Sequence, residues 1–398
     1  MRIVMGTLEL SLILLIVAAV VGVVSRHLRL PYTLALLLLG LALGATGITR
    51  PLALSSQVIL LLFLPPLLFE AAFRLDLRLL WARRRGVLAL ALPGVLLAAV
   101  VGGALVHWAA GLPWIIALLF GAMIAATDPV AVLAIFRQLR VDKSLSVLIE
   151  GESLFNDGTA LVLFVTLAGA VGGSFNAGYA VGYFCLAVLG GAAVGFAVGY
   201  VGHFLIALVE EHLGEMLVSV AVAYGAFLAG DQLHLSPVIA VLAAGMTLSH
   251  FGRTRGWVFS DGSERLLDDL WEFLAFTANA ALFLMIGLTV RTTGLTQHPF
   301  YVAWGIAAAL VGRVVVAYGL GTLLGPLGFA LTWAERHVLF WGGLRGAVAL
   351  VAALSLPPDF PYRAQLLAMT YGVVLFTVIV EGLTIGPLAR RLGLRRGP

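Results

Sequence analysis

The sequence predicts an all-α polytopic membrane protein, with thirteen transmembrane helices that include two inverted repeats. Apolar residues make up 61% of the 398 residues and charged residues 11%, far from the balance of soluble proteins. A bilayer span needs about 20 apolar residues, so the chain has room for little besides spans. The net charge of +4 does not indicate nucleic-acid binding. The positions of the basic residues are explained by the membrane topology, because most of them lie in loops on one side of the membrane.

Apolar segments separated by short polar stretches divide the chain into thirteen spans. We place them at residues 8–25, 31–48, 55–73, 86–108, 112–136, 146–172, 178–206, 216–230, 236–251, 270–290, 299–323, 337–356 and 365–388. The first segment lacks a charged leading region and a convincing cleavage site, so we expect a span and no cleaved signal. The eighth and ninth are short, and one of them could be re-entrant.

The distribution of Lys and Arg orients these spans. With the C-terminus inside, eighteen of the 24 basic residues fall in cytoplasmic segments and four fall outside. Because positive charges accumulate on the cytoplasmic side, we expect an outside N-terminus, a cytoplasmic C-terminus and a cell (inner) membrane location. The two remaining basic residues, Arg313 and Arg345, lie inside spans.

Two spans are interrupted by helix-breaking residues. Asp128-Pro129 lies in the fifth span, and Gly342-Gly343-Leu344-Arg345-Gly346 lies in the twelfth. Each is the middle member of a three-span unit, spans 4–6 and spans 11–13, and the units begin on opposite sides of the membrane. Interrupted helices in inverted repeats indicate a transporter site near the membrane midplane.

The first interruption suggests a cation ligand set. Asp favours the N-cap and Pro the first turn, so Asp128-Pro129 predicts a new half-helix inside the membrane. Asp128 would compensate the positive end of its dipole, and Thr127 and unpaired carbonyls would offer oxygen ligands. The alternative is a proline kink with Asp128 reaching an interface, but Arg137 and the nearest loop lie too far for a short side chain.

The sixth span carries polar residues on one face. Glu152 and Asn156 are four residues apart, as are Ser153 and Asp157, so all four can face one cavity. An oxygen cluster of Asp157, Ser153 and Thr127 suits an alkali cation as a metal site, and a proton would compete for the same carboxylate. The alternative is a helix–helix hydrogen-bond cluster, although a bare membrane charge costs about 3 kcal/mol or more.

The two membrane arginines need compensating groups. We expect Arg313 to form a structural ion pair with Glu152, which leaves Asp157 free to titrate. Arg345 would compensate the negative end of a half-helix dipole in the second break. The alternative is that either side chain reaches an interface.

Weaker features predict local contacts. Glu70 precedes Arg74 by four residues, which favours a helix-end pair over a part in ion entry. Asn279 could be a donor near the site or a packing contact. Small residues at four-residue spacing predict close helix packing at Gly191, Gly195 and Gly199.

Five motifs follow one another along the chain. They are 64–70 (LPPLLFE), 127–130 (TDPV), 151–157 (GESLFND), 342–347 (GGLRGA) and 381–385 (EGLTI). Together they resemble the signatures of the monovalent cation:proton antiporter-1 family, the sodium/proton exchangers, over essentially the whole membrane domain. The sequence has no long cytosolic tail, which is similar to prokaryotic members.

This resemblance implies a homodimer in lipid, two crossed broken helices in each protomer, and an elevator-like movement of a core against a scaffold. It also implies that Asp157 binds the ion and the proton, that Asp128 lies at the crossing, and that Asn156 marks an electroneutral branch. The segments we expect are scaffold or dimer helices in 1–85 and 211–295, core helices in 86–175 and 296–398, and a linker helix in 176–210.

We therefore expect a secondary antiporter that exchanges an alkali cation, Na⁺ first and Li⁺ also, for H⁺ in pH homeostasis. It would be no enzyme and would need no cofactor. A K⁺/H⁺ antiporter of the same fold is the alternative, since both ions use oxygen ligands. A cation channel would need a filter motif, and none is present. Residues 229–231 (AGD) faintly resemble a motif of the intramembrane aspartyl proteases. That Asp lies at a loop, however, which argues against this class of enzyme.

Overall fold

The structure is a computed structural model that describes residues 32–46, 56–171, 177–209, 211–254, 263–289, 294–323 and 331–394, with residues 21 and 173. Every regular element in these ranges is helical. Eight helices of this part of the chain are long and apolar enough to cross a membrane, and two shorter apolar helices accompany them. The first expected span, 8–25, lies outside the described residues.

The expected spans from the second onward each coincide with one helix or with successive helical segments. The uninterrupted ones are α2 (Tyr32–Thr46), α3 (Ser56–Arg74), α8 (Lys143–Ala170), α9 (Ala177–Ala207), α10 (His212–Gln232), α11 (Pro237–Thr254) and α12 (Ser263–Thr289). Their bounds agree with the sequence pattern to within a few residues, except that α12 begins seven residues early, at Ser263 against 270.

The other spans consist of consecutive segments. They are α4 (Leu77–Ala91) with α5 (Pro93–Ala110), α6 (Trp114–Ala125) with α7 (Val130–Leu139), α13 (Pro299–Val314) with η2 (Val315–Leu320) and α14 (Gly321–Leu323), α15 (Trp333–Trp341) with α16 (Ala347–Leu354), and α17 (Arg363–Phe376) with η4 (Thr377–Glu381) and α18 (Gly382–Arg391). The non-helical gaps after α6 and α15 are the two predicted interruptions. η2 and η4 are π-helical turns.

The fourth span begins earlier than expected, at Leu77 instead of residue 86. Asp76 causes the early start, because its carboxylate accepts the backbone N–H groups of Arg78 and Leu79 at 3.0 and 3.1 Å, and so caps the helix. α4 packs against α8. Residues 77–85 are therefore a helical extension of the first three-span unit.

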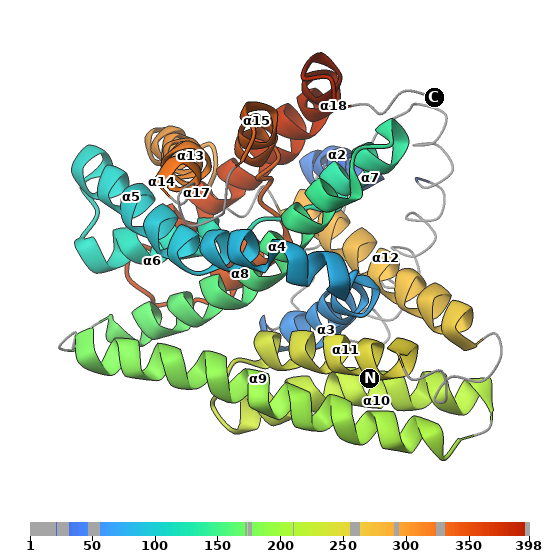
Figure 1. Cartoon of the computed structure of the whole chain (residues 1–398). Helices are drawn as coiled ribbons and strands as arrows, with labels where there is room; N and C mark the ends of the chain where they lie inside the picture. The colour runs from blue at the N-terminus through green and yellow to red at the C-terminus, as the bar shows by residue number, and fades with distance from the viewer. Residues whose placement is uncertain are drawn as a thin grey trace.

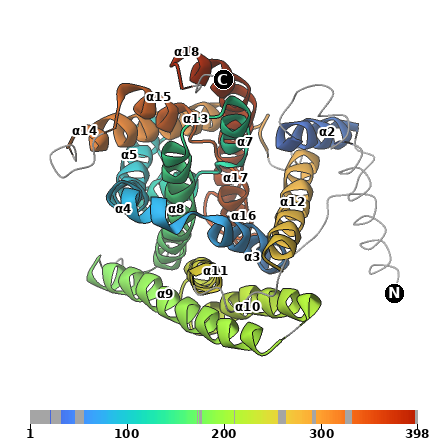
Figure 2. The ribbon, with the colours of Figure 1, turned by 45° about the vertical axis from the view of Figure 1, so that its right-hand side comes forward.

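The helices form two neighbouring groups. One contains α2, α3 and α9 to α12, and the other contains α5, α6, α13, α16 and α17. α9, α10 and α11 lie side by side along one edge of the molecule, away from α13, α15 and α18 (Figures 1 and 2). α2 packs on α12, and α3 packs on α11 and α12. α5, α6, α13, α16 and α17 pack together, while α9 contacts α8 in addition to α10 and α11. The site described below lies between the groups.

Backbone-to-backbone contact joins α9 to α11, as the spacing of small residues predicted. A Cβ atom at Gly191 would lie 2.8 Å from the carbonyl oxygen of Ser236, the residue before α11. At Gly195 or Gly199 it would lie 2.1 or 2.6 Å from a carbonyl oxygen of α11. Real Cβ atoms do not approach carbonyl oxygens so closely, so each position requires glycine. Small residues allow membrane helices to meet this closely.

Gly195→Leu should force α9 away from α11 and destabilise the protein, because overpacking of this kind costs about 1–3 kcal/mol or more. Gly182→Leu is the matched control on the same helix, since nothing lies within 4 Å of a Cβ there. We expect a lower melting temperature in detergent for Gly195→Leu alone. A fall of equal size in both variants would contradict this reading of the contact.

Candidate functional site

The first interruption is a four-residue non-helical segment, 126–129, between α6 and α7. Its Asp128 carboxylate accepts the N–H of Val130 at 3.0 Å, at the start of α7. This contact satisfies one of the amide groups that a helix start leaves unpaired. Asp128 therefore lies at the start of a half-helix inside the protein, where the sequence places it.

The second interruption crosses the first at Asp128. The backbone N–H of Asp128 donates to the carbonyl of Leu344 at 2.7 Å. A Cβ at Gly346 would lie 2.3 Å from a carboxylate oxygen of Asp128, so glycine is required there. The predicted crossing of two broken helices is thus held by a hydrogen bond between the breaks and by tight packing.

Polar side chains of α8 hold the first break in place. Asn156 accepts the Thr127 N–H at 3.2 Å and donates to the Thr127 hydroxyl at 2.7 Å. Ser153 donates its hydroxyl to the Thr127 carbonyl. Asn156 is buried and does not line the cavity described next. Its contacts are with Thr127, whereas the sequence analysis grouped it with the cation ligands.

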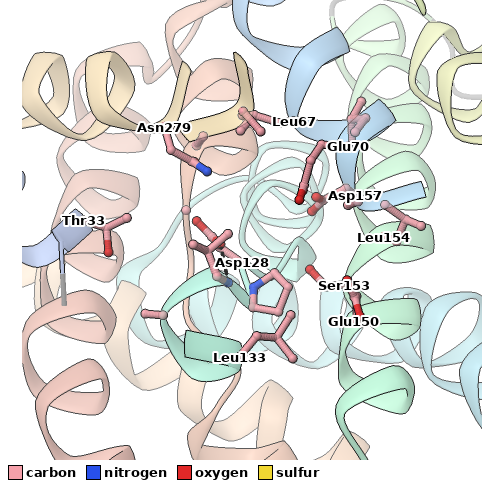
Figure 3. Close-up of a pocket in the computed structure, with 18 of the residues that line it drawn as sticks. Thr33, Leu67, Glu70, Asp128, Leu133, Glu150, Ser153, Leu154, Asp157 and Asn279 are labelled. Atoms are coloured by element: carbon pink, nitrogen blue, oxygen red, sulfur yellow. Dashed lines mark hydrogen bonds between the residues drawn. The ribbon is translucent and has the colours of Figure 1, made fainter. Parts of the chain in front are cut away.

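A cavity of about 490 Å³ contains the other predicted ligands. Thr127, Asp128, Ser153 and Asp157 line it, so the structure brings them together. Figure 3 shows Asp128, Ser153 and Asp157 around the cavity. A water molecule occupies about 30 Å³ in the liquid, so a hydrated cation fits. The Asp157 carboxylate accepts no hydrogen bond from any residue that the structure describes.

The cavity reaches the surface at one end of the molecule. Arg74 bridges two carboxylates there, with Glu70 at 3.1 Å and Glu272 at 2.8 Å. Arg137 and Glu150 also line this end. The predicted Glu70–Arg74 pair therefore exists, and Glu70 lines the cavity as well. Glu150 and Glu272 were not singled out from the sequence, since neither belongs to a recognisable motif.

Beyond Asp157, α8 meets α11. A Cβ at Gly158, the next residue along α8, would lie 2.2 Å from the Ile239 side chain. Ile239 and its neighbour Val238 are themselves buried. The packing of α8 against α11 is therefore tight at the residue that follows Asp157.

Arg313 links Glu152 to the end of a half-helix. Its guanidinium contacts both carboxylate oxygens of Glu152, one of them at 3.0 Å, and its Nε donates to the Leu339 carbonyl at 2.7 Å. The side chains are 8% and 2% exposed. Leu339 lies in the last turn of α15, so Arg313 also compensates the negative end of that half-helix.

Arg345 is buried within the second break. Its backbone N–H donates to the Thr377 hydroxyl at 3.0 Å, and its guanidinium donates to the Gly343 carbonyl. Glu381, one turn after Thr377 in η4, is also buried. In the sequence, Glu381 stands at the start of the motif 381–385 (EGLTI). Its position as an acid inside an apolar span could have identified it.

Comparison with known proteins identifies one family. The profile described as "Sodium/hydrogen exchanger, transmembrane" matches residues 12–391. The Na(+)/H(+) antiporter ApNhaP of Aphanothece halophytica is 39% identical over 404 residues, which cover 97% of this chain and 75% of that protein. The Na(+)/H(+) antiporter NhaH of Halobacillus aidingensis is 36% identical over 399 residues, or 96% of this chain and 97% of that one.

A solved structure has the same architecture. The sodium proton antiporter MjNhaP1 from Methanocaldococcus jannaschii at pH 8 superposes with a TM-score of 0.82, over 99% of this chain and 100% of that chain, at 20% sequence identity. The antiporter fold expected from the sequence is therefore confirmed. At 20% sequence identity, this similarity is evidence for the fold and not for the activity.

Glu152→Gln and Arg313→Ala should each destabilise the protein, because loss of one partner leaves the other charge buried at a cost of about 3–5 kcal/mol. Arg78→Ala is the control, since Arg78 is exposed at the start of α4. We expect lower melting temperatures in detergent for both pair variants only. Wild-type melting in both would show that the ion pair does not stabilise the fold.

Proposed function

The chain belongs to the sodium/hydrogen exchanger family, and we propose that it is an antiporter that exchanges Na⁺ for H⁺ across a membrane. It is a transporter and not an enzyme. The ions that it transports are its substrates, and transport of this kind needs no cofactor. The observation that carries the proposal is the Asp157 carboxylate, which lines a cavity large enough for a hydrated cation and has no hydrogen bond from the described residues. Such a group needs a cation or a proton to offset its charge.

Asp157 is proposed as the group that binds either the cation or the proton. Ser153 and Thr127 line the same cavity and supply neutral oxygen atoms, the ligand type that hard cations prefer. Asp128 adds a carboxylate at the crossing. Asn156 acts on the ion indirectly, because its amide fixes the position of Thr127.

The movement we propose is of the elevator type. Residues 86–175 and 296–398, with the extension of α4 to Leu77, form the moving core. Residues 1–85 before that extension, together with 211–295, form the scaffold through which two copies associate. The linker in 176–210 contains α9. This division is supported by the packing, since α9 contacts α8 on one side and α10 and α11 on the other.

The same proposal fixes the sidedness. With the N-terminus outside and the C-terminus inside, in the cell (inner) membrane, the ends of α3 and α7 and the start of α8 are cytoplasmic. Arg74 and Arg137, at two of these ends, line the open end of the cavity. The conformation described is then the one that exposes Asp157 to the cytoplasm.

Replacing the central carboxylate tests the proposal directly. Asp157→Asn should abolish Na⁺-dependent dissipation of a pH gradient in proteoliposomes, because the amide keeps the size but neither offers a negative ligand nor cycles a proton. The control is Asp359→Asn, a change to an exposed loop carboxylate, which should transport normally. Transport by a folded Asp157→Asn variant would place the site on another residue.

Competition at one carboxylate sets the pH dependence. As the pH falls, protons occupy Asp157 and the apparent affinity for Na⁺ should drop, roughly tenfold per pH unit once protonation dominates. At high pH the rate should fall again, because fewer carriers return protonated. Initial rates measured across pH at several Na⁺ concentrations should give a bell-shaped curve whose acid limb moves with Na⁺. An acid limb that ignores Na⁺ would exclude competition.

Stoichiometry follows from the number of free carboxylates. Glu152 is held by Arg313, and Asn156 is neutral, so we expect Asp157 to carry one monovalent cation or one proton in each direction. Exchange should then be electroneutral, and clamping the membrane potential should leave the rate unchanged. The same assay with Li⁺ and K⁺ in place of Na⁺ defines selectivity. A rate that follows voltage would mean a different stoichiometry.

A further inference from the structure

The cavity around Asp157 has two walls of different character. The wall that contains Asp128, Ser153 and Asp157 belongs to the two breaks, α7 and α8. The opposite wall belongs to α2, α3 and α12, and most of its side chains are apolar, among them Leu64, Leu67, Leu68, Ala275 and Phe276. Away from the charged open end, the side chains of that second wall with polar groups are Tyr32, Thr33 and Asn279.

Asn279 projects from α12 into the cavity, and its amide nitrogen points toward Asp128 (Figure 3). A half-turn of the amide would present the oxygen at the same place. Its side chain forms no hydrogen bond with any residue that the structure describes. The Thr33 hydroxyl, on α2, is equally without a hydrogen bond in this part of the chain, although Thr33 is only 6% exposed. Both polar groups line the cavity without a hydrogen-bond partner in the described protein, so they are available to a ligand that enters it.

The wall that carries Asn279 is a rigid unit. A Cβ at Gly40 of α2 would lie 2.4 Å from the Leu284 carbonyl oxygen, and a Cβ at Gly287 of α12 would lie 2.5 Å from the Leu37 carbonyl oxygen. These reciprocal contacts hold the backbones of α2 and α12 together. Asn279 and Thr33 therefore occupy fixed positions relative to one another.

We propose that Asn279 is a cation ligand on the stationary wall, which binds the ion through its amide oxygen, directly or through one water, while the site faces this cavity. This inference rests on the proposed antiport function. An amide oxygen is a hard, neutral ligand, so it changes affinity without changing the number of charges carried. When the core moves so that the site faces the other side of the membrane, Asp157 moves away from Asn279. The ion then no longer has this ligand.

The consequence is an affinity that differs between the two faces of the membrane. Asn279→Leu keeps the size of the side chain and removes the oxygen. It should raise the KM for Na⁺ about tenfold on the side where the cavity opens, which corresponds to about 1.4 kcal/mol. The KM on the opposite side should be unchanged. Asn279→Ser, which retains an oxygen, should lie between the wild type and Asn279→Leu.

The measurement uses everted and right-side-out vesicles from the same cells, with Na⁺-driven proton flux as readout. Leu67→Ala, a change in the same wall that removes no oxygen, is the control and should leave the ratio of the two KM values unchanged. If Asn279→Leu fails to fold, as judged by its melting temperature, Asn279→Ser alone should still show a one-sided rise in KM.

The outcomes separate the two proposals. A wild-type protein without Na⁺-dependent proton flux would overturn the antiport function itself. With an active wild type, an equal change in KM on both sides would assign Asn279 to the folding or movement of the core. No change on either side would show that its amide does not bind the ion. Either of these two results overturns the inference about Asn279 and leaves the antiport function standing.

Discussion

The structure depends on one constraint: two breaks within membrane helices expose backbone groups that lipid cannot satisfy. The breaks satisfy part of this need themselves, because the Asp128 N–H donates to the Leu344 carbonyl. Side chains supply the rest. Asn156 and Ser153 bind Thr127 in the first half, and Thr377 binds the Arg345 N–H in the second. In each half, the third span of the unit thus provides a polar side chain to the break in the middle span.

This use of polar groups leaves few for the transported ion. Most polar side chains near the crossing already have a protein partner, including the buried pair of Glu152 and Arg313. Asp157, like Asn279 across the cavity, has no hydrogen bond from the described residues, and it lies next to the tight contact between Gly158 and Ile239. The same crowding that fixes the breaks therefore concentrates the free charge at one end of the cavity. In the proposed transport cycle, an ion that bound at Asp157 would therefore meet a site whose neighbouring side chains are already held in place.

Local sequence pattern predicted much of this architecture. Span length, Asp-Pro and the glycine run placed the helices and both breaks, because these signals act within a few residues. The i, i+4 spacing also placed Ser153 and Asp157 on one face. Contacts between distant segments were harder to foresee. Nothing local predicts that Asn156 turns to Thr127, or that Arg74 reaches Glu272, 198 residues away. The bridge between α3 and α12 depends on how whole helices pack.

The π-helical turn Thr377–Glu381 carries a consequence for comparisons between relatives. A π turn contains one residue more than an α turn, and each residue of an α-helix rotates the chain by about 100°. A relative with one residue fewer between α17 and α18 would keep both ends of this span but would turn the side chain at position 381 away from Arg345. Alignments should therefore allow a single-residue gap in this span. The length of the span, as well as its composition, determines which residues face the crossing.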